Sequence, residues 1–393
     1  MIGMGALLLA AVSCSSSEDA DDDDNGGEAG ASSAATGGTG GSSSGKGGRG
    51  GSNGNCISRC VTEGAVCGEV LDSCGNPVSC GTCATGSCSE HHCVALGQFE
   101  VVSDNGGSLA DVVSIAGFGV DDVYFARSAA ALIPGRIDHY DGTNIRSVLD
   151  TPRSIFALSA TTGGKLFGAG AQGTFIYFDG DSWLEGAEWL DATPSSNLFS
   201  KLWAVSETDF WAGTDGLGDI YHYDGERFEL QNLPTTDSFT DTYALWGTAS
   251  NNVYASVYQE GLFRFDGSTW SKVMHPTAII SAIHGTGPND IWAVGTEIIH
   301  YDGTSWRLHQ AGAAFANTGI LNRRYHAVWA SPGGRVWIAG EEGVVLVGDT
   351  AGFSLVDTSG FAGTLFAIWG SGESDIWAGG SFETILRYTA DGG

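Results

Sequence analysis

One short pattern recurs seven times along this chain, and that repetition limits the possible folds more than any other feature. Each copy is centred on an aromatic residue that follows a turn, as in "NDIWAVG" and "SDIWAGG". Successive centres are 38 to 45 residues apart. The seven centres are Tyr124, Phe167, Trp211, Tyr254, Trp292, Trp337 and Trp377. A recurrence of this period is typical of a repeat architecture, so the pattern is a building unit and not a single site.

Most copies of the pattern contain four short apolar segments, counting the one around the aromatic centre. A segment such as "YALWG" precedes the aromatic centre, a segment such as "IIHYDG" follows it, and one such as "SWRLHQ" completes the unit. An Asp-Gly pair between two alternating apolar runs is a strong hairpin signal. We therefore expect four antiparallel strands per unit, with a type I′ turn and positive φ at both residues of the Asp-Gly pair.

Seven such sheets have one compact arrangement that hides their faces. A lone four-stranded sheet of this size would leave both faces and both edges exposed, whereas sheets packed radially bury their faces against neighbours. The sequence therefore predicts an all-β fold, a seven-bladed β-propeller over residues 97–393, with aromatic side chains filling the contacts between blades. An open solenoid of similar repeats is the alternative.

The ends of the repeat region indicate how the ring closes. The last copy lacks its fourth strand, and an unattached strand-like segment, "GQFEVVSD" at residues 97–104, precedes the first copy. We expect residues 99–102 to pair with residues 385–388, because an open ring would fray at its ends.

The turns of the repeat carry a family resemblance. The segments "FDGDSW", "FDGSTW" and "YDGTSW" resemble the Asp-box and BNR-type, WD-like repeats of bacterial propellers. In this chain Asp and Gly are adjacent, whereas a strict Asp-box separates them by one residue. The resemblance covers about residues 99–393 and implies a propeller.

The start of the chain indicates export. "MIGMGALLLAAVSC" opens with an apolar run of about twelve residues, too short to cross a bilayer and typical of a signal peptide. Its end, "AAVSC", resembles the lipobox of bacterial lipoproteins, with an ordinary apolar N-terminus and a chance cysteine as the alternative. The resemblance implies a signal peptide at residues 1–13 and lipidation of Cys14. Ser15 and Ser16 follow, and by the same resemblance they favour the outer membrane, at the cell surface or in the periplasm.

Two segments separate this start from the repeats. Residues 14–55 are acidic and then rich in glycine and serine, which predicts a flexible linker. Residues 56–93 hold eight cysteines, which predict a small module cross-linked by disulfides in an oxidising compartment. These cysteines are Cys56, Cys60, Cys67, Cys74, Cys80, Cys83, Cys88 and Cys93. Their pairing is open, and zinc held by "CGTC" with His91 and His92 is the alternative.

The charge of the chain excludes one class of partner. Its 46 acidic and 17 basic residues give a formal net charge of −29, and no Lys/Arg cluster is present. Such a protein repels phosphate backbones, so we expect no nucleic-acid partner.

Polar residues that recur at one position in several copies are expected to be structural. His139, His222 and His300 share one strand position, so they belong to separate blades and cannot converge on one metal ion. The turn aspartates are expected to hydrogen-bond the turn backbone. They are Asp141, Asp179, Asp224, Asp266 and Asp302. We predict no metal site and no cofactor, and a need for calcium stays open.

The loops between second and third strands are the candidate binding region, because in propellers they generally surround one end of the central channel. Six acidic residues follow the aromatic centres by four to six positions and are expected to form an acidic rim for a cation, a basic partner or a sugar. They are Asp215, Glu260, Glu297, Glu341, Glu342 and Glu383. Ordinary polar hairpin loops are the alternative.

The function predicted from these features is a non-catalytic one. We expect a monomeric propeller on a surface lipoprotein, touching the membrane through its lipid anchor only and serving as a binding scaffold for a protein or a glycan. The alternative is a carbohydrate-active hydrolase or lyase with site residues in the long segments 185–197 and 310–324, including Arg323 and Arg324. No Ser-His-Asp, P-loop or HExxH signature is present. A purely structural role in the envelope is a third hypothesis.

Overall fold

The computed structural model describes residues 68–71, 77–81, 87–89, 92–94 and most of 97–389. Within the last range it leaves out residues 105, 107, 129–133, 187–196, 236–239, 275–278 and 310–322. The predicted signal peptide, Cys14 and the linker lie outside the described residues, and so do the zinc alternative's His91 and most of the cysteines. No described helix is long and apolar enough to cross a membrane.

The described part of the cysteine-rich segment is made of two small hairpins. Strand β1 (Gly68–Leu71) pairs antiparallel with β2 (Pro77–Gly81), and β3 (Ser87–Ser89) pairs with β4 (His92–Val94). Cys88 and Cys93 stand opposite each other in the second hairpin. The disulfides themselves stay a prediction.

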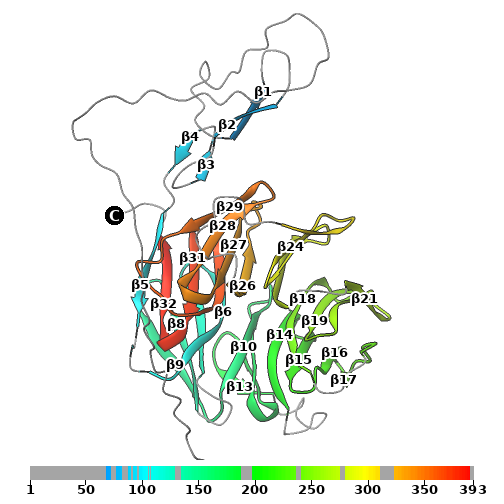
Figure 1. Ribbon diagram of the computed structural model, residues 1–393. Helices are drawn as coiled ribbons and strands as arrows, with labels where there is room; N and C mark the ends of the chain where they lie inside the picture. The colour runs from blue at the N-terminus through cyan, green and yellow to red at the C-terminus, as the bar shows by residue number, and fades with distance from the viewer. Residues whose placement is uncertain are drawn as a thin grey trace, which may run out of the picture. The chain divides into compact units, whose positions relative to one another are not determined.

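Seven four-stranded antiparallel sheets form the propeller (Figure 1). We number these blades in the chain order of their innermost strands. Blades 1 and 2 consist of β6 (Asp111–Gly119), β7 (Asp122–Ser128), β8 (Gly135–Tyr140) and β9 (Ile145–Thr151), and of β10 (Ile155–Ala160), β11 (Leu166–Gly170), β12 (Phe175–Phe178) and β13 (Trp183–Glu185). Blades 3 and 4 consist of β14 (Leu198–Ser206), β15 (Asp209–Asp215), β16 (Ile220–Tyr223) and β17 (Phe228–Leu230), and of β18 (Thr242–Ala249), β19 (Asn252–Val257), β20 (Gly261–Phe265) and β21 (Trp270–Met274).

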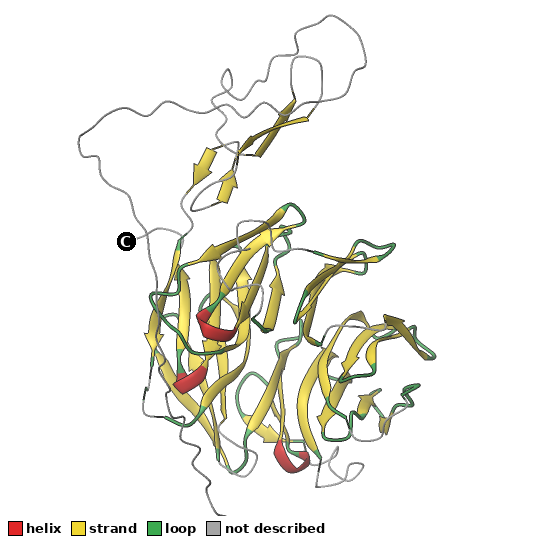
Figure 2. Ribbon diagram, viewed as in Figure 1, coloured by secondary structure: helices red, strands yellow, loops and turns green. Residues whose placement is uncertain are grey.

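The remaining blades follow the same order. Blades 5 and 6 consist of β22 (Ile280–Gly287), β23 (Asp290–Gly295), β24 (Ile298–Tyr301) and β25 (Trp306–Leu308), and of β26 (Tyr325–Ala330), β27 (Val336–Gly340), β28 (Val345–Asp349) and β29 (Gly352–Val356). Blade 7 consists of β30 (Leu365–Gly372), β31 (Asp375–Gly380), β32 (Ile385–Thr389) and β5 (Gln98–Ser103). Figure 2 shows the few helices as single turns; these are η1 (Ala171–Gly173), η4 (Glu341–Gly343) and η5 (Ser381–Glu383). The all-β, seven-bladed prediction is confirmed.

The two ends of the repeat region close the ring as predicted. Strand β5 completes blade 7 beside β32, with Phe99 opposite Tyr388 and Val101 opposite Leu386 (Figure 1). A further hydrogen bond runs from the Phe99 backbone N–H to the Asp357 carbonyl at 2.8 Å, which ties β5 to the end of blade 6. Sequence segments almost 300 residues apart are therefore held in one sheet.

The Asp-Gly turns differ from the prediction in one respect. Oδ1 of each turn aspartate accepts hydrogen bonds from the backbone N–H groups two and three residues further on. In the turn at Asp302 these donors are Thr304 and Ser305, both at 2.9 Å. In each turn the glycine has positive φ and the aspartate does not. The predicted type I′ turn is therefore wrong, because four residues, and not two, connect the strands and the aspartate side chain caps them. The predicted backbone contacts of these aspartates are confirmed.

Neighbouring blades fit together through one repeated contact near the middle of their innermost strands. Four blades place an indole there, and the next blade always offers a glycine to it. A Cβ added to that glycine would lie only 2.8 to 3.0 Å from the indole ring. The pairs are Trp203 with Gly247, Trp246 with Gly285, Trp329 with Gly370, and Trp369 with Gly117.

The other three blades place a smaller group at the indole position, and the next blade there offers alanine. By position in the strands, the three pairs are Ala116 with Ala160, Ser159 with Ala204, and His284 with Ala330. Ser159 Oγ accepts the Ala204 backbone N–H at 2.9 Å, and His284 Nδ1 accepts that of Ala330 at 3.1 Å. A large group thus faces glycine and a small group faces alanine around the whole ring, so each interface is filled without overlap.

A glycine-to-alanine change at one of these contacts tests the fit. Gly247→Ala is expected to lower the free energy of unfolding by about 1 to 3 kcal/mol, because its Cβ meets the Trp203 ring and the Asn252 carbonyl, both 2.8 Å away. Gly119→Ala is the control, since that Cβ meets nothing within 4 Å. Urea unfolding of both variants measures the difference. Equal stability of the two variants would disprove the contact's role.

The histidine at this position predicts a pH dependence. Burial lowers the pKa of His284 to about 4 from the usual 6.5, so the unfolded chain binds the proton first as the pH falls. Between pH 6.5 and 4, we expect the free energy of unfolding of the wild type to fall by about 2 to 3 kcal/mol more than that of His284→Asn. The asparagine keeps an acceptor near the position of Nδ1 but does not titrate. Unfolding curves across this range check it, and parallel pH profiles of the two proteins would contradict it.

Candidate functional site: the channel mouth

Every innermost strand of the propeller carries a β-bulge near its start. One residue of each strand has no partner on the second strand at that point. The seven bulged residues are Val113, Phe156, Ser200, Tyr243, Ser281, His326 and Phe366. A bulge bends its strand and redirects a side chain, and such features are common beside binding and active sites.

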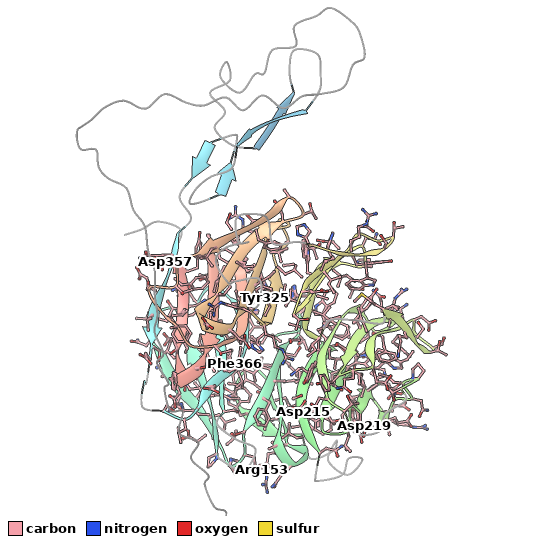
Figure 3. All side chains as sticks on the ribbon, in the orientation of Figure 1. Arg153, Asp215, Asp219, Tyr325, Asp357 and Phe366 are labelled. Atoms are coloured by element: carbon pink, nitrogen blue, oxygen red, sulfur yellow. The ribbon has the colours of Figure 1, made fainter. Side chains whose placement is uncertain are left out.

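The seven bulged residues meet around one cavity of about 340 Å³. Lys201, Asp215 and Arg324 complete its lining. We call this cavity, defined by these ten residues, the channel mouth; Figure 3 labels Phe366 and Asp215, which come from blades 7 and 3. A second cavity of about 210 Å³ is lined by the innermost strands of all seven blades, and it shares seven of these residues with the mouth. The mouth therefore opens into the central channel.

The channel mouth is chemically divided around its circumference. Blades 7, 1 and 2, which are neighbours in the ring, contribute the apolar Phe366, Val113 and Phe156. Blades 3 to 6 contribute the polar lining, with hydroxyl, imidazole and charged side chains. One half of the rim is thus apolar and the other half is polar.

Two cationic side chains stand on the polar half. Burial lowers the pKa of Lys201, against the opposing effect of the Asp215 and Asp241 carboxylates. Its ammonium group donates to the Ser200 carbonyl at 3.3 Å. The guanidinium of Arg324 lies over the Tyr243 ring at 5.1 Å, and its Nε donates to Ser281 Oγ at 3.1 Å.

His326 lies between these groups. Its pKa is lowered by burial and by the charges of Arg324 and Lys201, although Glu341 acts in the opposite direction. Nε2 is 4.0 Å from Glu341 Oε1, and the imidazole lies 5.6 Å from the Phe366 ring. A neutral imidazole at this place can both donate and accept a hydrogen bond.

Three residues of the predicted acidic rim lie at or beside the channel mouth. Asp215 lines it and accepts the Ser200 hydroxyl. Glu341 accepts the Arg324 backbone N–H at 3.1 Å. Glu342, with φ of 54°, pairs with Arg323 and is exposed. The rim at this end is therefore mixed in charge, with cations beside the carboxylates.

The other three residues of the predicted rim do not line the mouth. Glu260 is buried and pairs with Lys272 at 3.2 Å within blade 4. Glu383 is nearly buried and contacts Arg127 and Arg136 at 3.1 and 2.9 Å. Glu297 is half-buried in the loop between β23 and β24. The six carboxylates do not come together as one ring.

The recurrent histidines lie on separate blades, as predicted. Each stacks on the aromatic centre of its own blade and contacts an aspartate through Nε2, as His222 does with Trp211 at 3.9 Å and Asp209 at 2.9 Å. Within the described residues, no group of three His, Cys, Asp or Glu side chains is arranged to hold a metal ion. Arg324 of the alternative site reaches the mouth, whereas residues 187–196 and 310–322 of the two long segments lie outside the described part of the chain.

Lys201 and the seven bulged residues escape a sequence-based search for repeated patterns. The residue after each bulge is alanine in five blades and serine in blade 1, and only blade 3 has a lysine there. That departure from the repeat was the signal available in the sequence.

Comparisons with known proteins agree with this fold. No family model matches the chain, and no curated protein matches it. Among solved structures, YCF48 bound to D1 peptide is 15% identical, with a TM-score of 0.55, covering 76% of this chain and 97% of that one. The WD40 β-propeller domain of Doa1 is 9% identical, with a TM-score of 0.57, covering 75% and 98%.

A third similar structure is the extracellular domain of a putative one component system from B. thetaiotaomicron. It is 14% identical, with a TM-score of 0.55, and the match covers 74% of this chain and 40% of that one. At these identities the likeness shows the propeller fold and nothing finer.

Proposed function

We propose that this protein is a non-catalytic binding scaffold of the cell envelope, and that its protein or glycan ligand docks at the channel mouth. The observation that carries the proposal is the ring of bulges, which brings one side chain from each of seven blades to a single cavity. The side chains at the bulges differ in chemistry from blade to blade. A bulge needed for folding alone would accept the same small residue everywhere, so the variety favours recognition.

The comparisons support this proposal at the level of the fold. One similar propeller was solved with a bound peptide, and others are extracellular domains. Propellers present a rigid concave end, which lowers the entropy cost of ordering a binding site. The mouth of about 340 Å³ lies within the range of natural ligand sites.

Arrays test the proposed binding. The purified chain from residue 15 to 393 is applied to peptide, protein and glycan arrays, and retained ligands are tested again with Phe366→Ala. We expect this variant to lose the ligand, because Phe366 lines the mouth, and Phe118→Ala to keep it, because Phe118 is an exposed phenylalanine elsewhere on the propeller. Hydrolysis of a glycan without retention, or equal retention by both variants, would contradict the proposal.

We also propose that the chain is anchored through a lipid on Cys14, and that the cysteines of residues 56–93 form disulfides. The lipobox-like "AAVSC" supports the first and the cysteine density supports the second. Palmitate labelling in a bacterial host tests the anchor: label is expected on the wild type and absent from Cys14→Ser. Label that persists in Cys14→Ser would place the lipid elsewhere.

A further inference from the structure

The channel mouth holds two cations without carboxylate partners at ion-pair distance. Among the described residues, neither Lys201 nor Arg324 has an acidic side chain within 4.0 Å of its nitrogen atoms. By contrast, Arg127 and Arg136 each pair with Asp138 and Glu383, and Arg387 pairs with Asp375. In a chain of net charge −29, two unpaired cations in one cavity are unexpected by charge alone.

The carboxylates near these cations are already hydrogen-bonded. Asp215 accepts the Ser200 hydroxyl, and burial raises its pKa against the effect of Lys201. Glu341 accepts the Arg324 backbone N–H. The Nη atoms of Arg324 have no hydrogen-bond partner among the described residues. Donors therefore remain for a group that is not part of this chain.

Burying a cation without a partner costs free energy, and an incoming anion offsets that cost. A carboxylate suits this place because it accepts hydrogen bonds from an ammonium and a guanidinium together. The Ser281 and Tyr243 hydroxyls on the same half of the rim are further donors.

The apolar half of the mouth indicates which chemical group the ligand carries beside its carboxylate. Phe366, Val113 and Phe156 offer no hydrogen-bonding side chain, so they favour an apolar group on the ligand. When a uronic acid is held by its carboxylate, the opposite edge of its ring carries hydroxyls, and burying that edge against this wall would leave those hydroxyls unsatisfied. A peptide that ends in a hydrophobic residue suits both halves of the mouth. Its terminal carboxylate suits the polar half, its last side chain suits the apolar half, and the rest of the peptide leads out of the cavity.

We propose, building on the binding role above, that the channel mouth binds the C-terminal carboxylate of a peptide that ends in a hydrophobic residue. Lys201 and Arg324 hold the carboxylate. The terminal side chain lies against Phe366, Val113 and Phe156. The cavity of about 340 Å³ accommodates the end of a chain and not a folded domain.

Matched peptides test this proposal on the chain from residue 15 to 393. Short peptides ending in leucine or phenylalanine are compared with the same peptides amidated at the C-terminus and with versions ending in serine. Calorimetry measures the affinities. We expect amidation or a terminal serine to weaken binding about tenfold or more, because each removes one half of the recognition. Benzoate and a uronic acid oligosaccharide are further probes; tight binding of the oligosaccharide and not of the peptides would overturn the proposal.

Variants assign the effect to the two cations. Lys201→Met and Arg324→Met are each expected to weaken binding of the free-acid peptide about tenfold while leaving binding of the amidated peptide unchanged. Arg335→Met is the matched control, because Arg335 belongs to the same blade as Arg324 but does not line the mouth. Melting temperatures confirm that the variants fold.

The outcomes separate this proposal from the broader one. If free-acid and amidated peptides bind equally well and Phe366→Ala abolishes both, the scaffold function stands and the carboxylate specificity is wrong. If none of the peptides binds while the arrays show another ligand at the mouth, the specificity is again wrong. If neither the arrays nor the peptides show a ligand, both proposals fail.

Discussion

Phe99→Ala is expected to lower the free energy of unfolding by about 3 to 5 kcal/mol, the usual cost of removing a buried phenylalanine. Phe99 is fully buried, and its ring lies 5.6 Å from that of Tyr388 and 6.0 Å from that of Trp337. The alanine variant leaves a cavity at the contact between blades 6 and 7. It also weakens the attachment of β5, the strand that closes the ring, so the loss acts on the whole propeller.

Val101→Ala is the control for this prediction. Val101 lies two residues further along β5 with 46% of its surface exposed, so its truncation removes little buried area. We expect a change within about 0.5 kcal/mol. Urea unfolding followed by tryptophan fluorescence measures both variants. If Phe99→Ala were no less stable than Val101→Ala, the β5–β32 pairing would not hold the ring closed.

The blade number and the closure could be predicted because both depend on local patterns. Each aromatic centre of the repeat lies on the second strand of its blade, and all seven, including Trp211 and Trp292, are at most 4% exposed. One end of the repeat region has a strand without a blade, and the other end has a blade without its fourth strand. The two fit together in one way, with the strand completing the blade. Pairing of Phe99 with Tyr388 followed from this requirement.

The acidic rim could not be predicted in the same way, because equal spacing along the sequence does not set equal side-chain directions in loops. In blades 2, 6 and 7 the loop is one short turn whose middle residue has positive φ, as at Glu342 and Phe382. The loop of blade 3 instead turns at Gly216 and Gly218. Glu383 and Asp215 therefore meet different surroundings although both follow an aromatic centre.

The channel mouth escaped prediction for a related reason. A bulge shifts the alternation of side chains by one residue, so a strand read with strict period two places its inner and outer faces wrongly after that point. Tyr243 and His326 read as ordinary strand residues for this reason. The unusual lysine at Lys201 was visible in the sequence, but its meaning depends on the bulge beside it.

Arg127→Met is the second change with a large expected effect, again about 3 to 5 kcal/mol of lost stability. The Arg127 side chain is 5% exposed and joins blade 1 to blade 7 through Glu383. Its Nε donates to Asp138 at 2.5 Å, Nη1 to the Glu383 carbonyl at 2.8 Å, and Nη2 to Ser103 on β5 at 3.2 Å. Methionine fills similar space, but it leaves Arg136 as the one remaining ion-pair partner of the Asp138 and Glu383 carboxylates among the described residues.

Arg146→Met is the matched control, since Arg146 lines the same cleft of about 660 Å³ between blades 7 and 1 but is 63% exposed and pairs with Asp141 at the surface. We expect its loss to change stability by less than about 1 kcal/mol. Thermal and urea unfolding compare the two. Similar effects of the two changes would show that the Arg127 network is not what joins the blades.

A double variant shows how much of the stability lost in Arg127→Met comes from leaving buried carboxylates without their cation. Burial raises the pKa of Glu383, but the Ser108 hydrogen bond and the charges of Arg127 and Arg136 outweigh it, so the pKa is lower than usual. That carboxylate needs its cations in the folded state. Asp138→Leu added to Arg127→Met removes one of the two orphaned acids, and we expect it to recover part of the stability, because an apolar pair at such a site costs less than a half-broken ionic one. No recovery in the double variant would mean that the arginine acts by packing and not by charge. Glu383, which the sequence placed in a ligand-binding rim, instead helps to close the ring, because Glu383 in η5 and Ser103 on β5 both belong to blade 7 and both contact Arg127 of blade 1.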